Sequence, residues 1–66
     1  MPYATIWDLP KGVRNHLPEE AQLIWLHTFN AVYEDTGGDE DRARIAAWAN
    51  VKREFVKNGG GMWVRK

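Results

Sequence analysis

The chain offers few side chains that could act as nucleophiles. It contains no cysteine and no serine, so its only hydroxyl groups outside tyrosine belong to Thr5, Thr28 and Thr36. A serine or cysteine triad is therefore impossible. Glu19 and Glu20 could act as acid or base, but they open a predicted helix, where carboxylates ordinarily interact with the helix dipole. We therefore expect a protein that is not an enzyme and has no catalytic residues.

The possible metal ligands do not form a known ligand pattern. His16 and His27 lie on different predicted helices, and neither has a second histidine or a cysteine at ligand spacing. An EF-hand loop beginning at Asp35 would need glycine at its sixth position and glutamate at its last, where the chain has Glu40 and Ala46. The sequence predicts no metal site and no cofactor.

The charges are balanced in number but unevenly placed. Nine basic residues offset nine acidic ones, yet residues 34–41 contain only acidic charges and residues 42–66 are mostly basic. This asymmetry indicates a basic patch made of Lys52, Arg53, Lys57, Arg65 and Lys66. The simplest interpretation is a helix end matched to its dipole, followed by a solvated tail. The alternative is nonspecific, weak nucleic-acid binding through phosphate contacts on this basic C-terminal face.

Apolar spacing predicts three helices to position these groups. Leu9, Val13 and Leu17 recur every four residues, which indicates a short helix over residues 9–16. A second helix over residues 18–35 begins with Pro18 and ends before Gly37-Gly38. Its expected core stripe consists of Ala21, Ile24, Trp25, Thr28, Phe29 and Val32.

The third helix is predicted over residues 40–57, with Asp39 as its N-cap. Its expected apolar face consists of Ile45, Trp48, Ala49, Val51, Phe55 and Val56. Residues 3–7 and 62–64 are short and rich in β-formers, which indicates a strand near each terminus. We therefore expect a single domain over residues 1–66, mainly α with a minor β element, in which the N- and C-terminal strands pair.

One strip on the second helix lies beside the expected core. At about 100° per residue, Leu23 and Leu26 point away from the stripe, next to Asn30 and Tyr33. Adjacent exposed leucines beside a tyrosine are typical of a contact surface, so we predict partner binding through these four residues. The alternative is a wider core that covers the two leucines.

The sequence also gives expectations about location. The first nine residues lack the basic start and apolar stretch of a secretory signal. The longest apolar run is residues 45–49, far short of the roughly 20 residues that span a bilayer. We expect a cytoplasmic protein without membrane insertion.

Taken together and in order, short motifs along almost the whole chain resemble the ChaB family. They are Met1-Pro2-Tyr3, Asp8-Leu9-Pro10, Val13, Leu17-Pro18, Ala21-Gln22, Ile24, Phe29-Asn30, Ala47-Trp48, Val51-Lys52, Phe55, Lys57 and Trp63. The resemblance implies a compact helical domain with a small β element at its termini. It also implies a regulator of a sodium (calcium)/proton antiporter, hence a protein partner met from the cytosolic side of a membrane. Self-association is a further expectation.

Overall fold

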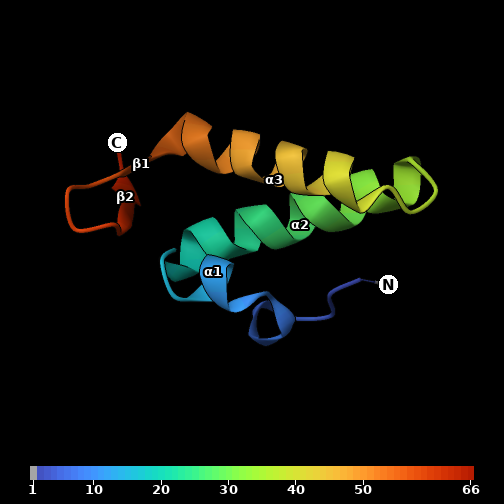
Figure 1. Ribbon diagram of the computed structural model, residues 1–66, viewed down its shortest axis with the longest axis horizontal. Helices are drawn as coiled ribbons and strands as arrows, with labels where there is room; N and C mark the ends of the chain where they lie inside the picture. The colour runs from blue at the N-terminus through green and yellow to red at the C-terminus, as the bar shows by residue number, and fades with distance from the viewer. Residues whose placement is uncertain (1) are drawn as a thin grey trace.

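The structure is a computed structural model that describes residues 2–66, so Met1 of the opening motif lies outside the described residues. It is mainly helical and carries a small hairpin at its C-terminal end (Figure 1). The elements are η1 (Ile6–Asp8), α1 (Lys11–Arg14), α2 (Glu19–Asp35), α3 (Glu40–Glu54), β1 (Phe55–Lys57) and β2 (Trp63–Arg65). The predicted fold class, mainly α with a minor β element, is confirmed.

The two long helices lie side by side and form most of the domain (Figure 1). The turn between them contains Gly37 and Gly38, at φ of 71° and 104°, which are left-handed values that favour glycine. Asp39 then caps α3, because its carboxylate accepts a hydrogen bond of 3.1 Å from the backbone N–H of Arg42. This turn brings α3 back along α2.

Aromatic rings form the centre of the core. Trp25 and Phe29 of α2 stack with their centroids 5.0 Å apart, and both side chains are almost completely buried. Trp48 of α3 meets the edge of Trp25 at 6.2 Å, and Trp63 of β2 lies 5.6 Å from Trp48. Ring contacts therefore join α2, α3 and the hairpin into one cluster.

The buried face of α3 differs from the predicted one. Ala43, Ala47 and Val51 have no exposed surface, and their spacing of four residues defines the face that meets the core. Ile45 is two positions from Ala43, about 200° around the helix, and it is 70% exposed. Its assignment to the core was wrong, as were those of Ala49 and Val56, which are also exposed.

The predicted pairing of N- and C-terminal strands was also wrong. Residues 3–7 contain no strand, and β1 instead pairs antiparallel with β2, with Val56 opposite Val64. Residues 55–57, expected to end a helix, are strand. The hairpin forms locally because the side chain of Asn58 accepts hydrogen bonds from the backbone N–H groups of Gly60 and Met62. A short loop costs less closure entropy than joining segments far apart in the sequence, and in Figure 1 the start of the described chain lies away from the hairpin along the long axis.

The position of Phe29 gives a stability prediction. Replacing Phe29 with alanine removes a ring that is 2% exposed and should lower the free energy of unfolding by about 3–5 kcal/mol. Urea denaturation followed by circular dichroism measures the change. Ile45→Ala is the control and should stay within about 0.5 kcal/mol of the parent. Equal effects of the two substitutions would contradict this description of the core.

Candidate functional site

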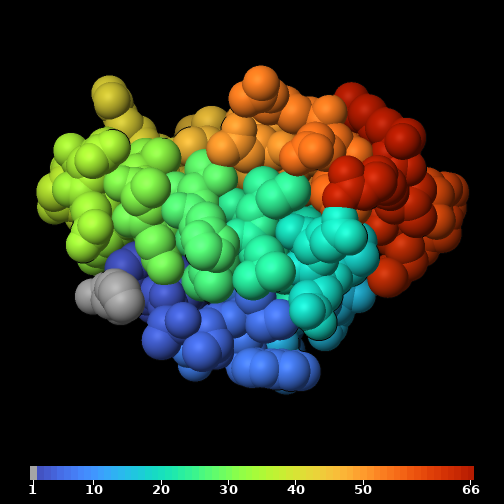
Figure 2. Space-filling model, turned by 180° about the vertical axis from the view of Figure 1, so that it is seen from behind, coloured from blue at the N-terminus to red at the C-terminus, as the bar shows by residue number. Residues whose placement is uncertain are grey.

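A groove runs between the N-terminal segment and the middle of α2. We call it the N-terminal groove; its volume is about 510 Å³. It is lined by Tyr3, Ala4, Thr5, Ile6, Trp7, Leu23, Leu26, His27 and Asn30. Figure 2 shows the N-terminal segment, in blue, lying along the green helix α2. The groove is lined by no carboxylate, lysine or arginine.

The N-terminal segment is fastened to α2 at Tyr3. The ring of Tyr3 lies 5.0 Å from that of Phe29 and 6.1 Å from that of Trp25. The side-chain amide of Asn30 donates a hydrogen bond of 2.8 Å to the carbonyl oxygen of Tyr3. An apolar contact and a polar contact therefore hold the same residue, which fixes one wall of the groove.

Trp7 is the most exposed large apolar residue on this wall, with 71% of its surface accessible. The guanidinium of Arg14 lies 5.3 Å from the centre of its ring and also donates a hydrogen bond of 3.3 Å to its carbonyl oxygen. Thr5 and Asp8 fix the backbone on either side, since the N–H of Thr5 donates to the carboxylate of Asp8 at 3.1 Å. The indole is therefore exposed and held in place.

The predicted strip on α2 lies only partly in this groove. Leu23 is 40% exposed, as expected, whereas Leu26 is only 7% exposed, so its predicted exposure was wrong. Leu26 packs in the hydrophobic core and also forms part of the groove lining. Asn30 also lines the groove, but Tyr33 does not; its ring stacks on Phe29 at 6.0 Å.

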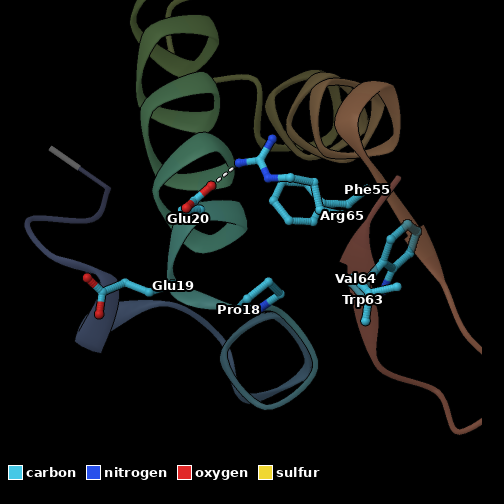
Figure 3. A pocket seen from close by; sticks show the side chains of 7 residues that line it. All are labelled: Pro18, Glu19, Glu20, Phe55, Trp63, Val64 and Arg65. Carbon is cyan, nitrogen blue, oxygen red and sulfur yellow. Dashed lines mark hydrogen bonds and ion pairs between the residues drawn. The ribbon is translucent and has the colours of Figure 1, made fainter.

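The residues of the predicted basic patch differ in their surroundings. Arg65 forms ion pairs with Glu20 and Glu54, and its guanidinium covers the ring of Phe55 at 4.9 Å. Figure 3 shows its side chain reaching from β2 to Glu20 on α2. This pairing ties the hairpin to α2 and partly neutralises the charge of Arg65.

The other members of the patch line different hollows or lie at the end of the chain. Lys52 and Lys57 line one hollow, beside Trp48 and Trp63, whereas Arg53 lines another with Ile24 and Glu54. Lys66 is exposed at the end of the chain and its backbone N–H donates to the carbonyl of Glu54. Of the five basic residues, only Lys52 and Lys57 line the same hollow.

Trp7 was not predicted as a site residue, although the sequence carried a signal for it. Thr5 and Asp8 have the spacing of a capping box, in which each residue bonds to the backbone of the other. This pattern starts a helical turn and argues against the strand that was predicted for residues 3–7. A turn at this place brings Trp7 to the surface.

Metal binding needs a cluster of ligand side chains, and crossing a membrane needs a long apolar helix. In the part of the chain from residue 2 to residue 66, no group of three or more His, Asp or Glu side chains is placed to hold a metal ion. Across the same residues, no helix has both the length and the apolar character needed to cross a bilayer.

These features define a small three-helix domain that is closed by a C-terminal hairpin and carries an uncharged groove beside its N-terminus. A family model described as ChaB matches residues 9–66. The chain therefore belongs to the ChaB family, and the resemblance seen in its motifs is confirmed.

Curated relatives match over the full chain. The "Putative cation transport regulator ChaB" proteins of Escherichia coli (strain K12) and of Shigella flexneri are each 37% identical over 75 aligned positions, covering 100% of this chain and 99% of the relative. A solved structure, "NMR solution structure of the putative cation transport regulator ChaB", is 35% identical, with a TM-score of 0.86. The match covers 98% of this chain and 99% of that one.

The two leucines of α2 provide a matched pair of substitutions. Leu26→Ala should lower the free energy of unfolding by about 2–5 kcal/mol because it empties a buried site. Leu23→Ala should change it by less than about 1 kcal/mol, because Leu23 is already 40% exposed. Thermal and urea denaturation of the two variants measures the difference. A larger loss for Leu23→Ala than for Leu26→Ala would contradict the assignment of Leu26 to the core and of Leu23 to the exposed edge of the groove.

Proposed function

We propose that this protein is a regulatory domain without catalytic activity that binds a protein partner through the N-terminal groove. The observation that carries the proposal is Trp7, a tryptophan that is 71% exposed yet held by Arg14 and by the Thr5–Asp8 turn. Tryptophan is enriched among the residues that dominate binding energy at protein interfaces. A side chain that is already ordered loses less conformational entropy on binding.

The lining of the groove supports a protein partner. Leu23 on α2 lies across the groove from the segment that carries Trp7, so the two exposed apolar side chains flank one concave surface. His27, which is exposed, supplies a polar group at the same surface, whereas the amide of Asn30 is used to hold Tyr3. Apolar anchors with a few polar groups are the usual composition of the centre of a protein interface. Tyr33, which packs away from the groove, is not part of the proposed interface.

The names of the relatives indicate the kind of partner. They describe regulators of cation transport. The resemblance of the motifs to the ChaB family implies a sodium (calcium)/proton antiporter as the transporter. We propose that the partner is the cytosolic surface of such a transporter. The proposed mechanism is binding alone: the domain alters transport by occupying a surface of the transporter, and no covalent step is involved.

The alternative, nonspecific nucleic-acid binding through five basic residues, has less support. Phosphate binding of that kind needs several cations along one face. Arg65 is engaged with two carboxylates, and Arg53 lies in a different hollow from Lys52 and Lys57.

Transport in everted membrane vesicles tests the proposal, because the cytosolic surface then faces the medium. Purified protein added to vesicles from the encoding organism should change the rate of cation/proton exchange. A variant with Trp7→Ala and Leu23→Lys should lose this effect while it keeps its melting temperature, because both changed side chains are exposed.

Ile45→Ala is the matched control, since Ile45 is also an exposed apolar residue but lies on α3, outside the groove. It should retain the full effect on exchange. An unchanged effect in the double variant, or no effect of the parent protein on exchange, would contradict the proposed function.

A further inference from the structure

We propose that a second surface, separate from the N-terminal groove, binds a nucleotide unit, meaning an aromatic base that carries a phosphate. The site is a hollow of about 320 Å³ lined by Gly12, His16, Trp48, Lys52, Lys57 and Trp63, which we call the aromatic–basic hollow. Its residues come from α1 and the turn after it, from α3 and from the hairpin, which approach each other toward one end of the domain (Figure 1).

Every titratable side chain that lines the hollow is basic. Lys52 and Lys57 are exposed, and neither forms an ion pair with any carboxylate of residues 2–66. In contrast, Arg42, Arg44 and Arg65 are each paired with an acidic side chain. The two ammonium groups are therefore available to an anion, in a domain whose net charge is zero.

Two tryptophans supply the aromatic part of the hollow. The rings of Trp48 and Trp63 lie 5.6 Å apart at an angle of 36°, and both residues are half-buried. Trp25 supports Trp48 from the core through an edge contact at 6.2 Å. Rings that pack on the core on one side and line a hollow on the other offer a face on which a base can stack. Such stacking is possible with any base.

His16 adds a polar group with a defined orientation. Its Nδ1 lies 3.1 Å from the carbonyl oxygen of Gly12, and since a carbonyl can only accept, Nδ1 carries the hydrogen. In that tautomer Nε2 has no hydrogen and can accept a hydrogen bond, as from the amino group of a base. The carbonyl oxygen of His16 also accepts a hydrogen bond of 3.0 Å from the backbone N–H of Trp63, which joins the turn after α1 to the hairpin.

The shape of the surface favours a nucleotide over other anionic partners. An anionic membrane is best met by apolar side chains that protrude, whereas Trp48 and Trp63 are half-buried in a concave surface. An acidic peptide would satisfy the two lysines but would leave the indole faces unused. A base with its phosphate uses both parts of the hollow, whether it is a free nucleotide or part of a single strand.

Nuclear magnetic resonance titration of the full chain with AMP tests the proposal. AMP should shift the indole N–H signals of Trp48 and Trp63 and leave that of Trp7 in place. Changing both Lys52 and Lys57 to glutamine should weaken AMP binding by about tenfold or more, because two charge-assisted contacts to phosphate are lost. The matched control is Arg53→Gln, which removes a neighbouring charge outside the hollow and should leave the affinity unchanged.

Further titrations identify the source of the nucleotide. A single-stranded decanucleotide that binds much more tightly than AMP, with strong salt dependence, assigns the site to nucleic acid; similar affinity per site assigns it to free nucleotides. Inorganic phosphate or anionic vesicles that reproduce the AMP shifts at equal phosphate concentration would overturn the proposal. So would equal AMP affinity in the parent and the double glutamine variant. These residues do not line the N-terminal groove, so either outcome is independent of the vesicle experiment.

Discussion

A continuous series of ring contacts holds the domain together. It begins at Tyr3 in the N-terminal segment, passes through Phe29 and Trp25 of α2 to Trp48 of α3, and ends at Trp63 of β2. A chain of 66 residues has a small core, and folding of so small a domain buries only about 60% of its unfolded surface. Large rings bury much area per residue and therefore compensate for the small number of buried side chains.

This aromatic frame also determines where the surfaces lie. At its first end, Tyr3 fastens the wall that presents Trp7 to solvent. At its other end, Trp48 and Trp63 open into the aromatic–basic hollow. The two surfaces differ in charge, since the groove has no lysine or arginine and the hollow has two lysines that no carboxylate of residues 2–66 pairs with. The core would therefore separate a ligand in the N-terminal groove from a ligand of different chemistry in the aromatic–basic hollow.

Local signals made the long helices predictable. The stripe through Trp25 and Phe29, the glycine pair after α2 and the capping aspartate before α3 act over a few residues, and the structure shows both helices. The wrong prediction of a strand at residues 3–7 also has a local cause. Residues 3–7 have strand-forming side chains, but the Thr5–Asp8 box gives them a turn instead. Intrinsic β-propensity was outweighed by a side-chain bond to the backbone.

The site was less predictable because it depends on contacts between distant residues. Helical geometry places Leu26 beside the core stripe but does not reveal that the core extends over it. The basic patch was inferred from charges near in sequence, while Arg65 finds Glu20, which lies 45 residues away. The pairing of Trp63 with His16 likewise joins two segments whose approach no spacing rule indicates. Composition identified the right residue types, and the tertiary structure decided which of them share a surface.

Hydrogen exchange of the four indole N–H groups tests the central claim, that the rings form a rigid frame while Trp7 is exposed at the surface. Trp25 is 1% exposed, and its Nε1 has no hydrogen-bond partner within residues 2–66, so slow exchange there reports burial alone. The structure predicts that Trp25 exchanges only through global unfolding, at a rate that follows the free energy of unfolding as urea is added, and that Trp7 exchanges almost as fast as free tryptophan. Fast exchange at Trp25, or protection at Trp7 equal to that of Trp25, would contradict the account.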